Sequence, residues 1–122
     1  MLLDTTFFVD LEYELTRSAP GPCAAFLAAH RHDPKHVSVI TLGEFAIGAS
    51  STTATLRFFH GYRRIALGRD LAIFGGQLQA SLPLTLGEND LWIAATAIAY
   101  RWPLVTHDRV FREVPGLKVM DY

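Results

Sequence analysis

Asn89-Asp90-Leu91-Trp92-Ile93-Ala94-Ala95, followed by Leu104-Val105-Thr106, is the part of the chain that decides its fold. Asn89 and Asp90 can cap a helix whose apolar residues cover one broad face and which ends before Trp102-Pro103. Leu104-Val105-Thr106 has the apolar character of a short buried strand. An amphipathic helix that leads into a buried strand is typical of proteins with a parallel sheet.

Outward from this stretch, the rest of the chain repeats the same alternation. We expect further strands at residues 2–3, 37–39, 65–67 and 117–120. Helices are expected at 7–15, 22–30, 41–49, from 51 onward, at 71–82 where Gly75-Gly76 weakens the pattern, and as a turn at 108–112. Thr41 with Glu44 matches a capping box for the helix at 41–49. The pattern predicts an α/β fold with a mainly parallel sheet covered on both faces.

Length and composition indicate one globular domain spanning residues 1–122. Half of the residues are hydrophobic and 19% are charged, which is typical of a well-packed protein. A second domain would leave neither part enough buried apolar surface. No apolar run approaches the roughly 20 residues of a membrane span, residues 1–10 lack a basic signal region, and Cys23 is the only cysteine. We therefore expect a cytoplasmic protein with no membrane segment.

Four acidic residues fall at comparable junctions between expected strands and helices. They are Asp4, Glu44, Asp90 and Asp108. Because functional sites in parallel sheets form at the carboxyl ends of strands, all four could meet at one edge. Neighbouring carboxylates repel one another, whereas a hard divalent ion supplies opposing charge and takes oxygen ligands. The expected ion is Mg²⁺ or Mn²⁺ rather than zinc, since no histidine or cysteine belongs to the set.

Each acid also has a purely structural interpretation. Asp4 could hydrogen-bond its own turn, and Glu44 could serve only the capping box. Asp90 could stabilise a first helical turn, and Asp108 could cap one. Taken singly, these interpretations are the commoner ones, but they do not account for four acids at equivalent junctions.

Leu2-Leu3-Asp4-Thr5-Thr6 contains the first of the four acids, and Ile40-Thr41-Leu42-Gly43-Glu44 contains the second. These stretches resemble the opening and the second acidic segment of PIN-domain ribonucleases, and in particular of VapC toxins of VapBC toxin–antitoxin pairs. Residues 87–95 and 104–111 resemble the third and fourth segments, whose order and spacing are the specific feature. Residues 114–119 resemble the VapC tail, so the likeness covers nearly the whole chain.

This resemblance implies a Rossmann-like three-layer α/β/α PIN domain that hydrolyses RNA. Asp4, Glu44, Asp90 and Asp108 would be the catalytic acids and would bind one or two Mg²⁺ or Mn²⁺ ions. Thr6, Thr106 and Asn89 would support those acids through hydrogen bonds. The resemblance also implies a VapB-type antitoxin as cognate partner, with a homodimer or a toxin–antitoxin hetero-oligomer as the assembly.

Surface properties leave two points open. The formal net charge of −1 is unusual for a nucleic-acid binder, although it includes the four acids. Five apolar residues could supply an antitoxin groove or a dimer face, although core packing is the default for any one of them: Phe45, Ile47, Phe58, Phe59 and Tyr62.

Two other functional classes remain as alternatives. A PIN-fold module could bind its protein partner without catalysing any reaction. A phosphoacceptor signalling domain also places acids around magnesium at strand ends, but it needs a lysine at the end of a late strand. Lys118 lies within the last expected strand, and His107 follows Thr106 at the other candidate junction.

Overall fold

A five-stranded parallel sheet forms the centre of the protein. The structure is a computed structural model that describes residues 1–122. The strands are β1 (Leu2–Leu3), β2 (His36–Ser38), β3 (Arg63–Ile65), β4 (Leu104–Val105) and β5 (Val119–Met120), in the spatial order β3-β2-β1-β4-β5. Every neighbouring pair is parallel, and Leu3 of β1 lies between Val37 and Val105. The expected parallel sheet is confirmed.

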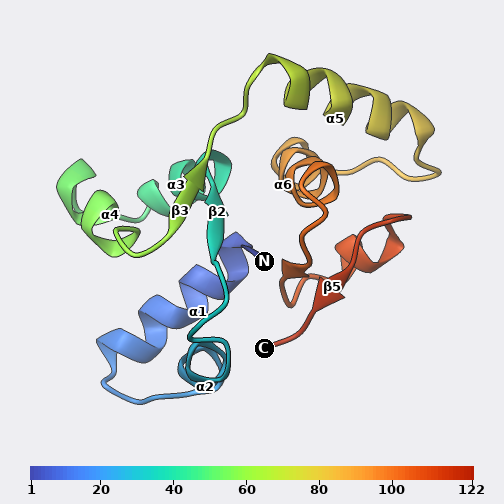
Figure 1. Cartoon of the computed structure of the whole chain (residues 1–122). Helices are drawn as coiled ribbons and strands as arrows, with labels where there is room; N and C mark the ends of the chain where they lie inside the picture. Colours follow the sequence, from blue (N-terminus) through green and yellow to red (C-terminus); the bar gives the residue numbers. More distant parts are fainter.

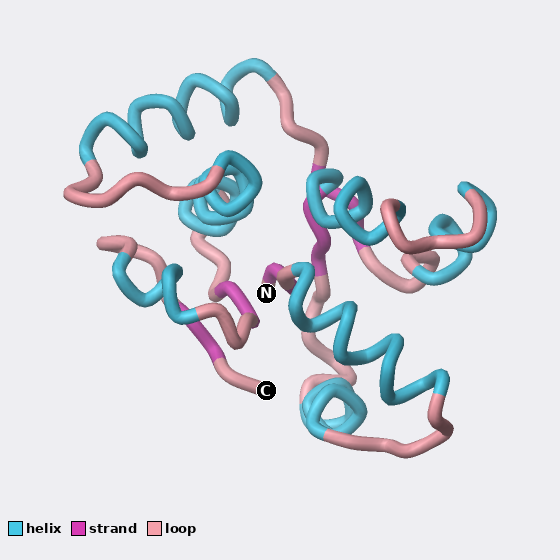
Figure 2. The backbone as a smooth tube through the Cα atoms, turned by 180° about the vertical axis from the view of Figure 1, so that it is seen from behind, coloured by secondary structure: helices cyan, strands magenta, loops and turns pink.

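Helices cover both faces of this sheet (Figure 1). They are α1 (Thr5–Thr16), α2 (Pro22–Ala29), α3 (Val39–Ala46), α4 (Thr52–Phe58), α5 (Arg69–Ser81) and α6 (Glu88–Ala99), with a short 3₁₀ helix η1 (Arg109–Glu113). Both backbone views show α1 beside α2 on one side and α5 outside α6 on the other (Figures 1 and 2). The three-layer α/β/α architecture is therefore confirmed.

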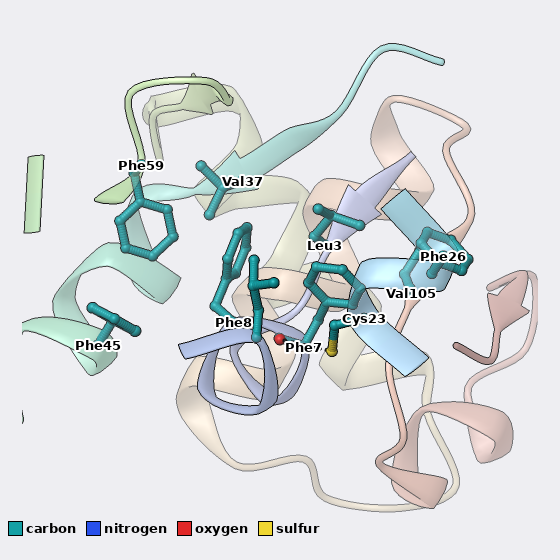
Figure 3. Packing of buried hydrophobic residues seen from close by; sticks show 10 residues of the cluster. Leu3, Phe7, Phe8, Cys23, Phe26, Val37, Phe45, Phe59 and Val105 are labelled. Atoms are coloured by element: carbon teal, nitrogen blue, oxygen red, sulfur yellow. Dashed lines mark hydrogen bonds between the residues drawn. The ribbon is translucent and has the colours of Figure 1, made fainter. Parts of the chain in front are cut away.

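Alternate residues of each short strand serve the two helical layers. Leu3 and Val105 belong to one buried cluster, into which Phe7 and Phe8 of α1 project (Figure 3). Leu2 and Leu104, the preceding residue of each strand, belong to a second cluster built around α6. Because successive side chains of a strand point to opposite faces, two residues are enough to join both cores.

The helix α3 begins earlier than the sequence pattern predicts. Ser38 is its N-cap and accepts a hydrogen bond from the Ile40 amide at 3.1 Å. Thr41 is fully buried inside the helix, where its hydroxyl oxygen lies 3.2 Å from that of Thr5. The predicted capping box is wrong because the last strand residue already caps the helix, which leaves Glu44 free to point elsewhere.

Helix α6 also begins differently. Its N-cap is Gly87, which has no side chain to accept a capping hydrogen bond, and Asn89 and Asp90 lie in the first turn. The prediction that they cap the helix is wrong. The Asn89 amide is instead hydrogen-bonded to Glu44, a residue of another helix.

The edge strand β3 lies two residues before the predicted strand at 65–67. It spans Arg63–Ile65 because Arg63 pairs with His36 and so sets the register with β2. Arg63 and Arg64 are exposed. Charged residues on an edge strand are common because they discourage pairing with another chain. A search for apolar residues therefore does not detect the start of this strand. Helix α3 ends at Ala46, three residues before the predicted end at 49, and the remaining bounds moved by one or two residues.

Helix α5 continues through the glycine pair that was expected to weaken it. A Cβ atom on Gly75 would lie 2.5 Å from the Trp92 ring, whereas Gly76 faces open space. Gly75 therefore permits close packing of α5 on α6. Neither of these helices, nor any other, combines the length and the apolar character needed to cross a membrane.

Candidate metal centre

The four predicted acids line one pocket of about 400 Å³. Asp4 directly follows β1, and Asp108 follows β4 by three residues. Glu44 comes from α3, which follows β2, and Asp90 comes from the first turn of α6. The parallel sheet explains this convergence, since the carboxyl ends of its strands share one edge.

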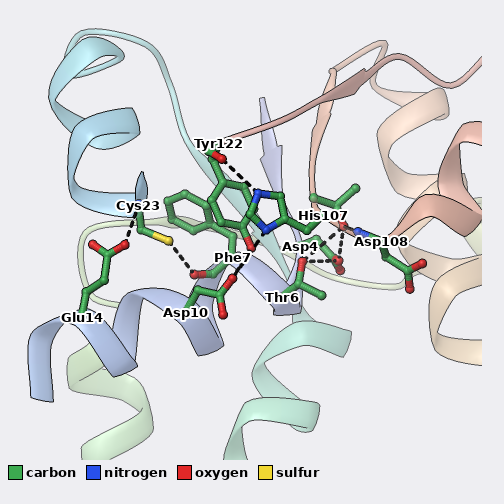
Figure 4. A network of polar contacts seen from close by, with 10 residues as sticks. Asp4, Thr6, Phe7, Asp10, Glu14, Cys23, His107, Asp108 and Tyr122 are labelled. Carbon is green, nitrogen blue, oxygen red and sulfur yellow. Dashed lines mark hydrogen bonds and ion pairs between the residues drawn. The ribbon is translucent and has the colours of Figure 1, made fainter. Parts of the chain in front are cut away.

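Asp4 is the most firmly held of the four. Its side chain is only 3% exposed, and its Oδ2 atom accepts hydrogen bonds from Thr106 at 2.7 Å and Thr6 at 3.1 Å (Figure 4). Burial raises the pKa of Asp4, and the nearby Glu44 acts in the same direction, while the hydroxyl donors counteract it. Thr6 and Thr106 thus contact the acid that they were expected to support.

Glu44 is fixed through both of its carboxylate oxygens. Thr5 donates a short hydrogen bond to Oε2, and the Asn89 amide donates to Oε1 at 2.9 Å. Asn89 therefore connects α6 to α3 and contacts an acid, as expected of a supporting residue. The position of Glu44 depends on residues that follow β1 and that begin α6.

Asp90 and Asp108 face the same pocket with fewer partners. Burial raises the pKa of Asp90, and the negative charges of Asp108, Asp4 and Glu44 raise it further. Asp108 is the N-cap of η1, where its Oδ1 atom accepts from the Val110 amide at 3.0 Å. Its own amide donates to Thr106 at 3.0 Å, so Thr106 contacts two of the four acids.

The pocket is a rim of carboxylates rather than a closed set of ligands. No three His, Cys, Asp or Glu side chains of the protein converge closely enough in this arrangement to hold one ion. The structure brings the four acids to the lining of one cavity.

Sequence reasoning missed Thr5. Thr5 lies in the same opening motif as Asp4, and only the packing of α3 against α1 shows that its hydroxyl reaches Glu44. Asp10 is an exposed residue of α1 that lines the pocket together with His107, and its Oδ2 atom lies 3.7 Å from His107 Nδ1. Thr6, which also lines the pocket, lies four residues before Asp10, so both side chains are on the same face of α1.

Known proteins resemble the chain in both sequence and structure. The PIN-domain family model matches residues 1–117. Ribonuclease VapC4 of Mycobacterium tuberculosis is 30% identical over 132 residues, an alignment that covers 98% of this chain and 94% of that protein.

Two solved structures have the same fold over almost the full length. The VapBC2 complex of Rickettsia felis bound to a promoter DNA fragment gives a TM-score of 0.80 at 24% identity, covering 98% of this chain and 96% of that chain. A toxin–antitoxin complex of Klebsiella pneumoniae gives 0.70 at 27% identity, covering 95% and 93%. Together with the family match over residues 1–117, these similarities show that the chain belongs to the PIN-domain family.

Proposed function

We propose that the protein is a Mg²⁺- or Mn²⁺-dependent endoribonuclease and the toxin of a type II toxin–antitoxin pair. The observation that carries this proposal is the convergence of Asp4, Glu44, Asp90 and Asp108 on one pocket in a PIN-domain chain. The relative that is 30% identical bears the name ribonuclease, which supports the same reaction class.

The donor set fits a hard divalent cation. All four side chains offer carboxylate oxygens, which are the preferred ligands of magnesium and manganese. Burial is the main cause that raises the pKa values of Asp4 and Asp90, and the negative charges of the neighbouring carboxylates add to it. A bound ion would balance that negative charge, activate a water and stabilise charge on the phosphate during phosphodiester hydrolysis.

The neighbouring hydroxyl and amide groups would keep the acids in place. Thr106 and Thr6 orient Asp4 through their hydroxyl groups, and Thr5 and Asn89 orient Glu44. Each of these donors stabilises the ionised carboxylate, which is the form that binds a cation. Protein groups around a metal site commonly tune it in this way.

The proposed partner is a VapB-type antitoxin, because the similar solved structures are toxin–antitoxin complexes. Of the five apolar residues considered for such a surface, Phe45 and Phe59 are buried in the core, whereas Ile47 is 89% exposed. Leu56 of α4 is half exposed and, with Leu42, lines a groove between α3 and α4. This groove is a suitable place for an apolar segment of the partner, or for a second copy of the chain.

The phosphoacceptor alternative lacks its lysine. Lys118 precedes β5, so it lies at the opposite edge of the parallel sheet from the four acids. The non-catalytic binding module remains the alternative against which an assay is designed.

The deciding experiment is cleavage of total cellular RNA by the purified, antitoxin-free protein. We expect cutting with Mg²⁺ or Mn²⁺, no cutting with chelator, and loss in Asp4→Asn and in Asp90→Asn. Asp70→Asn is the matched control, since Asp70 is an exposed acid of α5 paired only with Arg69. If the folded wild type binds an antitoxin but cuts no RNA with either metal, the nuclease proposal fails and the binding-module interpretation replaces it.

A further inference from the structure

A second cavity of about 350 Å³ adjoins the carboxylate pocket. The two cavities share Asp10 and His107 as lining residues. Figure 4 shows Asp4, Thr6 and Asp108 on one side of His107, with Cys23 and Glu14 beyond Tyr122 on the other. A polymeric ligand with a phosphate at the four acids could therefore place the chemical group next to that phosphate in the second cavity.

The wall between the cavities is held by several contacts. The His107 ring lies flat on the Tyr122 ring, with centroids 3.7 Å apart and an interplanar angle of 12°. His107 Nε2 is 2.9 Å from the main-chain oxygen of Tyr122, and the Tyr122 hydroxyl donates to Asp10 Oδ2 at 2.7 Å. Phe7 supports the Tyr122 ring from the core, edge to face, at 4.9 Å. The wall is thus preorganised for a flat ligand.

The outer side of the cavity carries an aromatic ring and a positive charge. Tyr13 is 57% exposed, and the Arg17 guanidinium lies 4.2 Å from the centroid of its ring. Cys23 lies at the inner side as a buried thiol, and burial raises its pKa to about 12, so it remains neutral and apolar in character. Aromatic rings combined with arginine are the usual platform for single-stranded bases.

We propose that this cavity, lined by Asp10, Tyr13, Arg17, Cys23, His107 and Tyr122 and here named the base pocket, binds the nucleobase next to the scissile phosphate in single-stranded RNA. The proposal rests on the nuclease function proposed above and names the part of the substrate that the neighbouring cavity recognises.

Size and charge favour a base over a phosphate group. The volume lies in the range of about 300–1,000 Å³ typical of small-ligand pockets. The carboxylates of Asp10 and Glu14 line it and would repel a phosphate, whereas a base is neutral. The contacts of Asp10 involve Oδ2, which leaves Oδ1 to accept a hydrogen bond from an amino or imino group of the base.

The test measures RNA binding without cleavage, so that it does not depend on the metal. A 12-nucleotide single-stranded RNA that the enzyme cuts is labelled, and its affinity is measured by fluorescence anisotropy in chelator. The measurement is repeated with a series of strands, each of which carries one abasic nucleotide at a different position. We expect one abasic position beside the cut site to weaken wild-type binding about tenfold. Tyr13→Ala should bind the intact strand about tenfold more weakly and lose this sensitivity.

Matched variants separate the base pocket from general effects. Tyr100 is also about half exposed, but it lies at the far end of α6 from Asp90, so Tyr100→Ala should keep the wild-type abasic profile. Arg17→Met, which removes the charge over Tyr13, should weaken binding without unfolding the exposed end of α1. Circular dichroism checks that all variants are folded.

The possible outcomes distinguish this proposal from the nuclease proposal. If the wild type cuts RNA but its abasic profile is flat, or is the same in Tyr13→Ala, the base pocket is overturned and the nuclease function stands. If the wild type neither binds nor cuts any RNA, both proposals fail. If a protein partner covers the base pocket and abasic positions do not change RNA affinity, the assignment of a base to the pocket is likewise overturned.

Discussion

The hydroxyl of Thr106 connects two of the four acids. It donates to Asp4 Oδ2 at 2.7 Å and accepts from the Asp108 amide at 3.0 Å, and the residue is fully buried. A buried hydroxyl with two such partners cannot be replaced by a methyl group without leaving polar groups unpaired. Its position immediately after β4 connects the sheet to the carboxylate pocket.

We predict that Thr106→Val lowers RNA cleavage by about 10- to 100-fold, the usual effect of losing a hydrogen bond to a metal-binding acid. Thr106→Ser should restore most of the activity because it keeps the hydroxyl. Thr96→Val is the control, since Thr96 is equally buried but donates only to the Trp92 carbonyl of its own helix. Initial cleavage rates at saturating metal provide the measurement, and equal losses in both valine variants would contradict the prediction.

At the scale of elements, close contacts between helices are made by residues that carry little sequence signal. Glu14 of α1 accepts hydrogen bonds from the amides of Gly21, Cys23 and Ala24, so a side chain of one helix serves the N-terminus of α2. These bonds hold the pKa of Glu14 below its ordinary value although partial burial acts in the opposite direction. The contact between α5 and α6 depends on Gly75, because a side chain at that position would collide with the Trp92 ring.

We predict opposite effects from two adjacent glycine substitutions in α5. In Gly75→Ala the new methyl group would collide with the Trp92 ring, which should cost about 1–3 kcal/mol of unfolding free energy. In Gly76→Ala the methyl group meets no atom, and the reduced freedom of the unfolded chain should add about 0.4–1 kcal/mol. Urea unfolding of both variants checks the prediction, which is contradicted if Gly75→Ala is as stable as Gly76→Ala.

At the scale of the whole molecule, the fold gathers negative charge that opposes its own stability. Two hydrophobic cores hold the strands together from both faces, while four carboxylates meet at one edge of the sheet. The raised pKa of Asp90, caused first by burial and then by its acidic neighbours, means that its ionised form disfavours the folded state. Under the proposed function, a bound cation would offset this loss of stability.

We therefore predict that the melting temperature of Asp90→Asn in chelator is at least that of the wild type. The substitution removes a buried negative charge that its acidic neighbours repel. Millimolar Mg²⁺ or Mn²⁺ should raise the melting temperature of the wild type, since a ligand that binds only the folded state stabilises it. The same ions should raise the melting temperature of Asp90→Asn by a smaller amount. Thermal unfolding with and without metal measures both effects, and a metal-induced rise in Asp90→Asn as large as in the wild type would contradict the proposed role of Asp90 as a ligand.

The sequence alone predicted the architecture because its information is local and periodic. Apolar strands such as Leu104-Val105 and the broad apolar face of α6 define a parallel α/β fold, whose strand ends must share one edge. That rule was enough to place Asp4, Glu44, Asp90 and Asp108 in one pocket. Motif resemblance predicted the family, which the comparison of residues 1–117 showed.

Only the tertiary structure decided how side chains pair across elements. The capping box at Thr41 failed because Ser38 competed for the same helix start, and Asn89 reached Glu44, which is 45 residues away in the chain, instead of capping its own helix. The base pocket joins Tyr13 of α1 to His107 and Tyr122, about 100 residues later. Such contacts depend on how helices pack on the sheet, and a local sequence pattern carries no record of distances between segments that meet only when the chain folds.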